Sequence, residues 1–336
     1  MPLRVGLNGA GRIGRTLLRL LVDDPKVEIA AINDVAGAQA VAHLLRHDSV
    51  YGTPPFAVEA TAGALRVAGR SIPFTAFARP EEIPWRAREV AAVVEATGRF
   101  SRADEARRHL AGGIPRVLVT AVCPGADATL VPGLADLATA GDRPVVSVAS
   151  CTTQAAALPL ALLDRWFGVI AAEMTTVHCT TGSQVTMDQP HADPRRARSA
   201  LLSMIPTTTS AGAGLAAALP WLAGRISCLA IRVPTASVSL VEVVAQTERP
   251  AGPRDGLADR FRAAAADPPL AGRLGVTDEP LVSVDFRGDS RSSVVDLPLL
   301  EVPGPQLARV IAWYDNEWGY SHRVAEVLRV WGESPD

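Results

Sequence analysis

The first 23 residues contain the feature that most constrains the fold. Leu3–Leu7 has the pattern of a buried strand, Asn8–Gly14 (NGAGRIG) follows it, and Arg15–Asp23 has a helical pattern. A G-x-G-x-x-G run between a strand and a helix is a dinucleotide-binding fingerprint. Its glycines allow a tight turn, close approach of a pyrophosphate, and packing of the helix on the strand. We expect the phosphates of a dinucleotide to bind at this helix N-terminus. The alternative is a tight turn that binds no nucleotide.

A second strand pattern supports the dinucleotide interpretation. Val27–Ile32 is β-branched and apolar, and it ends in Asn33-Asp34. In such folds a carboxylate about 20 residues beyond the glycines binds the ribose hydroxyls. Asp34 lies at about that distance, so we expect it to contact the cofactor.

Strands and helices continue to alternate as far as residue 150. Val90–Glu95, Arg116–Ala121 and Pro144–Val148 read as strands, and Ser101–Ala111 reads as a helix. Alternation of this kind predicts an α/β fold with a doubly wound parallel sheet. Thr97 and Thr120 then lie at the carboxyl ends of strands, where ligands bind in such sheets.

The pattern changes after residue 151. Strand-like segments dominate and few helices interrupt them, which predicts an α+β domain with a mixed, largely antiparallel sheet. The predicted strands are Ala230–Val233, Ser237–Gln246, Leu281–Phe286, Ser292–Leu300 and Ala308–Tyr314. An amphipathic helix at about Ser321–Val330 closes the chain. A chain of 336 residues is longer than a single hydrophobic core usually organises, so two domains are expected.

Cys151 stands between a strand pattern and an Ala/Leu-rich helical run, within Ala149–Gln154 (ASCTTQ). A helix N-terminus favours an anion, so the pKa of a thiol there is expected to fall, and the thiolate is the nucleophile. A small buried residue at a strand end is the alternative. The flanking hydroxyls are poor core material, and the strand-like Met174–Val177 leads to His178, a candidate base. These two observations favour a reactive thiol.

Composition narrows the classes of function. The net charge is −2, so no broad surface for nucleic acid or an anionic membrane is expected. The four cysteines form no CxxC pair and no zinc spacing, which predicts free thiols, no metal site and a reducing compartment. The N-terminus has no secretory apolar region, so the expected location is cytoplasmic.

Taken together, these motifs resemble the glyceraldehyde-3-phosphate dehydrogenase family along nearly the whole chain. The resemblance rests on the glycine run with Arg15, on Ile32-Asn33-Asp34, Ala149–Thr153, Thr175–His178, Asp193–Arg198, Arg232–Thr235 and Trp313–Tyr320. It implies a Rossmann-type NAD-binding domain over 1–150 plus about 316–336 and a catalytic domain over 151–315. It also implies a homotetramer.

The resemblance further implies a reaction. Cys151 would add to the aldehyde of glyceraldehyde 3-phosphate, with His178 as its base. Hydride transfer to NAD would leave a thioester, which inorganic phosphate would convert to 1,3-bisphosphoglycerate. The cofactor-binding residues implied or expected are Gly9, Gly11, Arg12, Ile13, Asp34, Thr97, Thr120 and Asn316, and Asn316 would orient the nicotinamide carboxamide. Pro190 and Asp34 favour NAD over NADP.

Residues for the two phosphate sites are carried over by position. Thr181, Arg196 and Arg232 resemble ligands of the substrate phosphate and nearby anions, and Ser150, Thr152 and Thr209 resemble those of inorganic phosphate. Ser210, directly after Thr209, belongs to the same hydroxyl-rich turn. Each residue, taken singly, can also be a turn or cap residue.

Several positions depart from the family pattern near these anion sites. Gln154, Ser183, Ser210 and Ala213 replace the usual Asn, Asp, Gly and Lys, and Cys179 follows His178 where Ala is common. The departures leave open a related aldehyde such as erythrose 4-phosphate, a specialised or inhibitor-tolerant isozyme, and a non-phosphorylating enzyme. A non-catalytic NAD-binding or RNA-binding protein is a further alternative, which retention of Cys151 and His178 disfavours.

Overall fold

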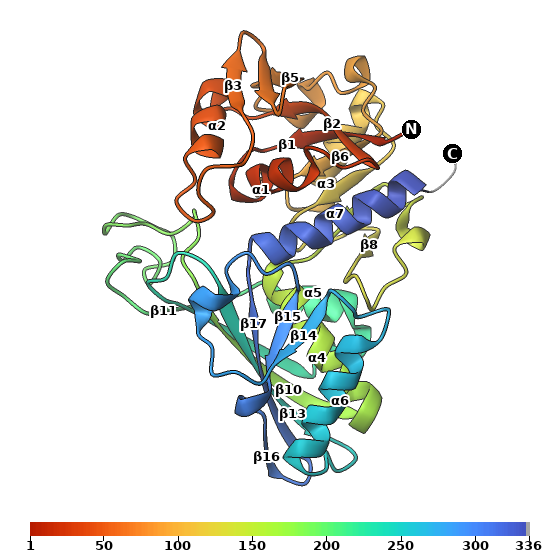
Figure 1. The fold of residues 1–336 in the computed structure, drawn as a ribbon, viewed down its shortest axis with the longest axis vertical. Coiled ribbons are helices and arrows are strands. Elements are labelled where there is room, and N and C mark those ends of the chain that lie inside the picture. Colours follow the sequence, from red (N-terminus) through yellow and green to blue (C-terminus); the bar gives the residue numbers. More distant parts are fainter. Residues whose placement is uncertain (334–336) are drawn as a thin grey trace. The chain divides into compact units, whose positions relative to one another are not determined.

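The protein was analysed as a computed structural model, which describes residues 1–333. The chain forms two compact units (Figure 1). Unit 1 consists of residues 1–149 together with the C-terminal helix from Ser321 onward, and unit 2 consists of Ser150–Tyr320. The domain limits expected from sequence stay a prediction, and their last part, residues 334–336, lies outside the described residues.

Unit 1 contains a nine-stranded sheet in the order β3-β4-β5-β2-β1-β6-β7-β9-β8. All pairings from β5 to β8 are parallel, whereas β3, β4 and β5 form antiparallel hairpins. The strands are β1 (Leu3–Asn8), β2 (Val27–Asn33), β3 (Val58–Thr61), β4 (Ala64–Val67), β5 (Arg70–Thr75), β6 (Ala92–Glu95), β7 (Val117–Val119), β8 (Ala128–Thr129) and β9 (Val145–Ser147). Strand order reverses between β1 and β6, which is where nucleotides bind in such sheets.

The helices of unit 1 are mostly short. They are α1 (Arg12–Leu21), α2 (Gly37–Arg46), α3 (Ala103–Ala106) and most of α7 (Trp318–Glu333), with 3₁₀ turns η1 (Pro80–Glu82), η2 (Arg86–Arg88), η3 (Arg107–Gly112) and η4 (Ala138–Ala140). The helix expected over Ser101–Ala111 is α-helical for one turn and continues as η3. Within unit 1, Arg329 of α7 donates to Asp24 beyond α1 at 2.7 Å.

Unit 2 contains an eight-stranded mixed sheet in the order β11-β12-β10-β13-β17-β15-β14, with β16 paired to β17. Only the β10–β12 and β14–β15 pairings are parallel. The strands are β10 (Val169–His178), β11 (Ile205–Thr207), β12 (Ile226–Arg232), β13 (Ser239–Thr247), β14 (Leu274–Thr277), β15 (Ser293–Asp296), β16 (Glu301–Gly304) and β17 (Leu307–Tyr314). The predicted fold class, a doubly wound parallel sheet plus a mixed, largely antiparallel sheet, is confirmed.

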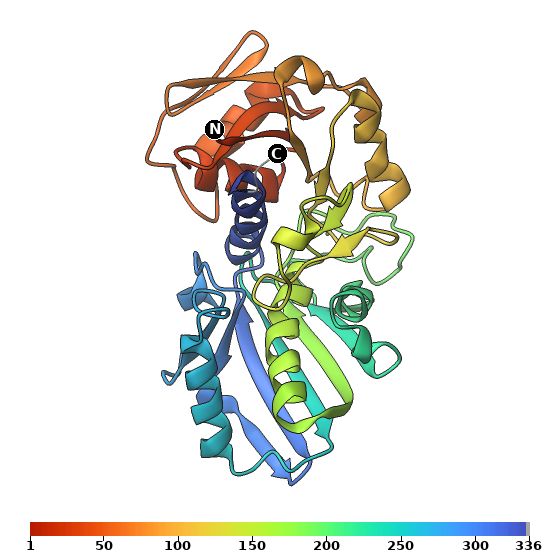
Figure 2. The same cartoon turned by 90° about the vertical axis from the view of Figure 1, so that its right-hand side faces the viewer.

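Helix α4 (Cys151–Phe167) packs across β10, β13, β15 and β17 of this sheet (Figure 2). The remaining helices of unit 2 are α5 (Ala211–Ala218), α6 (Arg254–Ala266), η5 (Pro220–Leu222), η6 (Ser283–Phe286) and η7 (Leu297–Leu299). Because α4 is apolar almost all round and its residues 152–160 are buried, it is a core helix rather than a surface one. Its first residue is thereby held firmly in place.

The strand predicted over Leu281–Phe286 is wrong. The segment contains the 3₁₀ turn η6, in which the Asp285 carboxylate accepts the N–H of Val282 at 2.8 Å. The alternation of the sequence is real, because Val282 and Val284 are exposed while Phe286 is buried and stacks on Trp313. Alternation does not make a strand when a side chain satisfies the backbone donor instead of a neighbouring strand.

Candidate active site

The candidate nucleophile is the first residue of α4. The hydroxyl of Ser150, the N-cap residue, accepts the N–H of Thr153 at 3.1 Å, which satisfies one of the free donors of the first turn. Ala149 before it has a φ of +51°, a left-handed conformation that is uncommon outside glycine. The chain therefore turns sharply into the helix and places Cys151 at its N-terminus.

The candidate base is the last residue of β10. The Nε2 atom of His178 lies 3.5 Å from the Sγ atom of Cys151, although the two residues are 27 apart in the sequence. The ring is buried, and its Nδ1 lies 2.8 Å from the carbonyl oxygen of Cys179. The geometry places a thiol and an imidazole within proton-transfer reach, as nucleophilic catalysis requires.

Tyr314 connects the two elements that carry this pair. Its hydroxyl lies 2.9 Å from the hydroxyl of Thr152 on α4 and 2.9 Å from that of Thr176 on β10. Its ring packs edge-on against His178, with centroids 6.0 Å apart. The sequence indicated no separate role for Tyr314, which lies within the Trp313–Tyr320 motif. A tyrosine at the buried end of a strand is the signal that could have identified it, because a buried hydroxyl needs partners.

A guanidinium lies directly beside the imidazole. Parallel pairing of β10 with β12 sets Arg232 opposite His178, and Nη1 of Arg232 lies 2.5 Å from Nδ1 of His178. Burial, and secondly this cation, lower the pKa of His178 to about 3. The imidazole is therefore neutral at physiological pH and can accept a proton.

The expected fall in the pKa of the Cys151 thiol is contradicted. Burial raises the pKa of this thiol, although Arg232 and hydrogen bonds involving Thr152 act in the opposite direction. The helix N-terminus is thus not enough to offset loss of hydration around the sulfur. Proton transfer from Sγ to Nε2 keeps the pair neutral as a whole, so it avoids burying a single uncompensated charge.

Two arginines of unit 2 have features of anion ligands. The Nε atoms of Arg196 and Arg232 are buried, and neither has a hydrogen-bond partner among residues 1–333. A buried donor without a partner is costly, and an anion offers acceptors in the geometry that a guanidinium prefers. Thr181 is partly buried, and its hydroxyl lies 3.2 Å from that of Ser183. Ser183, where the family resemblance led us to expect an Asp that helps to hold an arginine, thus contacts Thr181.

The hydroxyl-rich turn before α5 has ordinary backbone geometry. Ser210 is exposed and has a φ of −77°, so its side chain causes no strain where the family has glycine. The Thr209 hydroxyl accepts the N–H of Ala211 at 3.1 Å. Ala213 is exposed on α5, whereas Gln154 is buried within α4.

Unit 1 holds the glycine turn expected to bind a dinucleotide. Gly9 has a φ of +96°, and a Cβ atom there would lie 2.7 Å from the Thr97 backbone nitrogen. A Cβ atom on Gly14 would lie 2.1 Å from the Gly9 carbonyl oxygen, whereas one on Gly11 would meet no atom within 4 Å. The first and third glycines are therefore required by close backbone packing, and the second leaves open space beside the helix N-terminus for a pyrophosphate.

A cavity of about 200 Å³ opens next to this turn. Gly9, Gly11, Asp34 and Thr97, four of the predicted cofactor-binding residues, line it. Residues that the sequence reasoning did not assign to the cofactor also line it: Asn8, Asn33, Val35, Phe77, Ala78, Pro80, Ile83, Ala96, Arg99 and Phe100. Glycine backbone, a carboxylate and aromatic rings around one groove are the features expected where one nucleoside of a dinucleotide binds.

The remaining predicted cofactor residues have other positions. The Arg12 guanidinium donates to Asp48 at 2.6 Å and lies over the Tyr51 ring. Ile13 is half-buried in the first turn of α1, and the Thr120 hydroxyl donates to the Glu95 carbonyl at 3.1 Å. Asn316 belongs to unit 2 and is described below.

A buried hydrogen-bond network that sequence reasoning missed supports the cavity. The Glu95 carboxylate accepts from Asn8 Nδ2 at 2.6 Å and from the Thr97 N–H at 2.8 Å, and it lies 3.0 Å from His109 Nε2. Trp85 donates its indole N–H to the other nitrogen of His109 at 3.1 Å. Two residues that line the cavity, Asn8 and Thr97, are therefore held by one buried carboxylate.

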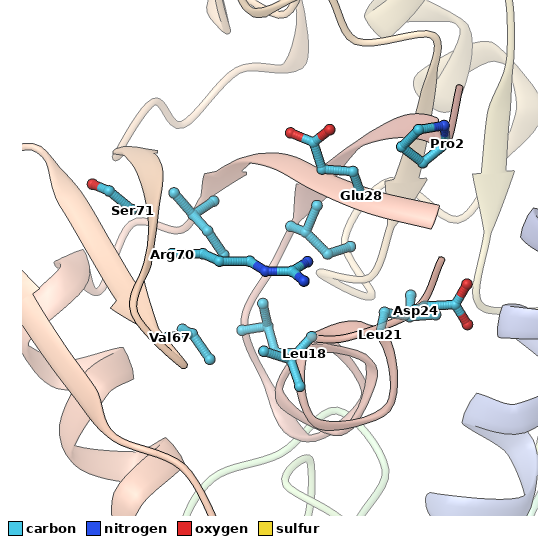
Figure 3. A pocket seen from close by; sticks show the side chains of 11 residues that line it. Pro2, Leu18, Leu21, Asp24, Glu28, Val67, Arg70 and Ser71 are labelled. Carbon is cyan, nitrogen blue, oxygen red and sulfur yellow. The ribbon is translucent and has the colours of Figure 1, made fainter. Parts of the chain in front are cut away.

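A second cavity of unit 1, of about 330 Å³, lies between α1, β2 and the β4–β5 hairpin (Figure 3). Aliphatic side chains such as Leu18 and Val67 form much of its lining, and Arg70 reaches across it. Arg70 pairs with Asp23, and Asp24 accepts from Arg329. These charges are already satisfied, so the larger cavity lacks the chemistry of the smaller one.

Residues 1–333 contain neither a cluster of metal-ligating side chains nor a membrane-spanning helix. No three His, Cys, Asp or Glu side chains in that range are grouped as a metal site would require. Among the same residues, no helix combines the length and apolar character that a membrane span needs.

Both units are similar in sequence to proteins of one known family. Residues 3–103 match the family model for the glyceraldehyde 3-phosphate dehydrogenase NAD binding domain, and residues 150–316 match that for the C-terminal domain. Glyceraldehyde-3-phosphate dehydrogenase 1 of Bacillus cereus is 41% identical over 96% of this chain and 97% of its own. The enzyme of Cereibacter sphaeroides is 42% identical over 99% of both, and that of Kitasatospora aureofaciens 43% over 97% and 98%. The chain belongs to the glyceraldehyde-3-phosphate dehydrogenase family.

Proposed function

We propose that the protein oxidises glyceraldehyde 3-phosphate with NAD and inorganic phosphate, forming 1,3-bisphosphoglycerate. The observation that carries the proposal is the 3.5 Å separation of Cys151 Sγ and His178 Nε2, with Arg232 beside the imidazole. A thiol, a base and a cation at one point suit covalent attack on an aldehyde that carries a phosphate. Membership of the family supports the same reaction.

Cys151 and His178 perform the acyl chemistry. Nε2 takes the thiol proton while Sγ bonds to the aldehyde carbon, and the protonated ring and the Cys151 N–H stabilise the resulting alkoxide. The hemithioacetal loses a hydride to become a thioester. Attack by inorganic phosphate then breaks the C–S bond and returns the thiolate, which recovers its proton from His178.

Bound NAD supplies the hydride acceptor, and this chain's residues bind and orient it. We assign the pyrophosphate to Gly9, Gly11 and the first turn of α1 with Arg12 and Ile13. Asp34 binds a ribose, Thr97 and Thr120 lie along the carboxyl ends of β6 and β7, and Asn316 binds the nicotinamide carboxamide. The open space at Gly11 and the cavity beside it support this assignment.

The phosphate groups bind through arginines and hydroxyls of unit 2. We assign Arg232, Arg196 and Thr181 to the substrate phosphate and its surroundings, and Ser150, Thr152, Thr209 and Ser210 to inorganic phosphate. The position of Arg232 beside His178 supports its assignment, because a phosphate there would lie close to the reacting pair. Ser150 and Thr152 already have structural partners, so their hydroxyls would have to be shared or exchanged on binding.

The decisive experiment is steady-state NADH production from glyceraldehyde 3-phosphate with and without inorganic phosphate. We expect turnover that requires phosphate and is abolished by Cys151→Ala. Turnover without phosphate would instead show a hydrolysing enzyme. Unchanged turnover of the Cys151→Ala protein would refute covalent catalysis and revive the non-catalytic alternative.

A related aldehyde is the second candidate substrate, because Ser183, Ser210 and Ala213 alter the surroundings of the anion ligands. Erythrose 4-phosphate carries the same reactive groups one carbon further apart. Comparison of kcat/KM for the two phosphorylated aldehydes decides between them. A higher value for erythrose 4-phosphate would replace the first assignment.

We also propose a cytoplasmic homotetramer. The segment 182–204 carries the large exposed apolar side chains Met187, Leu201, Leu202 and Met204, which a second copy would cover. The buried thiols of Cys123 and Cys179 suit a reducing compartment. Light scattering after size-exclusion chromatography checks the assembly, and a monomer at micromolar concentration would contradict it.

A further inference from the structure

Cys179 connects the candidate base with a second side chain of unit 2. Its carbonyl oxygen lies 2.8 Å from Nδ1 of His178, and its backbone N–H donates to the Ser239 hydroxyl at 3.1 Å. Its thiol donates to Oδ1 of Asn316 at 3.0 Å, a contact between residues 137 apart in the sequence. One residue thus contacts both the proposed base and the amide that we assign to the cofactor.

The Asn316 side chain is buried and follows directly on a capped turn. Its backbone lies between β17 and α7, where the Asp315 carboxylate accepts the N–H groups of Glu317 and Trp318 at 3.0 and 2.9 Å. Asn316 is 5% exposed and Cys179 is 1% exposed, so water does not compete freely for their hydrogen bond. A side-chain amide has a donor edge and an acceptor edge, and its partners decide which way it points.

We propose that Cys179 is a positioning residue, whose thiol fixes the orientation of the Asn316 amide for the nicotinamide carboxamide. The S–H group takes one lone pair of Oδ1 and leaves the second for the carboxamide N–H. The inference rests on the proposed role of Asn316 in cofactor binding. An alanine at this position would offer no such donor.

The chemistry of the thiol suits the role. Burial raises the pKa of Cys179 to about 12, so it remains an S–H donor at any physiological pH. Serine at the same position also donates, whereas alanine cannot. The two substitutions therefore separate loss of the hydrogen bond from loss of the sulfur.

The test is equilibrium binding by the full-length protein, measured by calorimetry and without turnover. The probes are NAD and 3-acetylpyridine adenine dinucleotide, which keeps the carbonyl but lacks the amide N–H. We expect the wild type to bind NAD more tightly than the analogue. In Cys179→Ala the ratio of the two dissociation constants should shrink about two- to tenfold, the effect of one neutral hydrogen bond. Cys179→Ser should keep the preference.

Cys123→Ala is the matched control, because Cys123 is also buried but packs in a hydrophobic cluster of unit 1. It should leave the preference unchanged. An unchanged preference in Cys179→Ala, equal loss of affinity for both dinucleotides, or a wild type without preference would each overturn the inference. Because the readout is binding, absence of aldehyde oxidation in the wild type would refute the proposed function and leave this result interpretable.

Discussion

Nη1 of Arg232 lies 2.5 Å from Nδ1 of His178, and the carbonyl oxygen of Cys179 lies 2.8 Å from the same nitrogen. The guanidinium can only donate and the carbonyl can only accept, so the two compete for opposite tautomers of the ring. When Nδ1–H donates to the carbonyl, Nε2 is free to take the Cys151 proton. An anion that draws the guanidinium away therefore favours the tautomer that catalysis needs.

Replacement of Arg232 should act on phosphorylated substrates specifically. Arg232→Gln should lower kcat/KM for glyceraldehyde 3-phosphate about ten- to a hundredfold, the usual effect of losing a hydrogen bond to a charged group. Arg232→Lys should lose less, because it keeps the charge but not the planar fork. Unphosphorylated glyceraldehyde is the control substrate, and an equal loss with it would argue against a phosphate contact.

Acid should destabilise the protein through His178. Its pKa is about 3 in the folded protein, below the ordinary value of 6.5, so the unfolded chain binds the extra proton first as pH falls. The stability from keeping the ring neutral is complete above about pH 6.5 and is lost as pH falls toward 3. Between pH 7 and pH 5 this amounts to roughly 2 kcal/mol.

Thermal denaturation of the wild type and His178→Gln at pH 7 and pH 5 measures this contribution. The melting temperature of the variant should fall less on acidification than that of the wild type. Arg232→Gln should lie between the two, because it removes the second cause of the low pKa and leaves burial in place. If the melting temperatures of all three proteins fall equally between pH 7 and pH 5, the pKa of His178 is not lowered in the folded protein.

Removal of the Tyr314 hydroxyl should loosen the link between α4 and β10. Tyr314→Phe removes the hydroxyl that bridges those of Thr152 and Thr176 and should cost about 1–3 kcal/mol of stability. We expect a lower melting temperature and a reduced kcat, because the helix that carries Cys151 is less well held. Tyr51→Phe, a partly exposed tyrosine of unit 1, is the control. If Tyr314→Phe behaves like that control, the hydroxyl does not hold the site together.

Glu95→Gln should weaken dinucleotide binding, although residue 95 does not line the cavity. The Glu95 carboxylate accepts hydrogen bonds from Asn8 and Thr97. A glutamine amide would point its own N–H at one of these two donors, which would then lack an acceptor. We expect the dissociation constant for NAD, measured by titration, to rise about tenfold, in line with an unmet buried donor. Glu89→Gln, on an exposed side chain, should have no effect. Equal affinities in the two variants would refute a supporting role.

Local patterns account for what was predictable in the fold. The glycine turn, the alternation of strands and helices in unit 1 and the helix after Cys151 follow from residue types within a few positions of one another. The strand predicted over Leu281–Phe286 is wrong because a local pattern of alternation does not supply a neighbouring strand. Whether a partner strand is present depends on distant parts of the chain.

The sequence by itself determined that a thiol begins a helix, that a histidine ends a strand and that a glycine turn can receive a pyrophosphate. Only the tertiary structure decided that the thiol and the imidazole meet at 3.5 Å, that strand register sets Arg232 beside the ring, and that Cys179 contacts Asn316. The direction of the Cys151 pKa was misjudged for the same reason. A helix dipole can be read from nearby residues, whereas loss of hydration depends on every element packed around the sulfur.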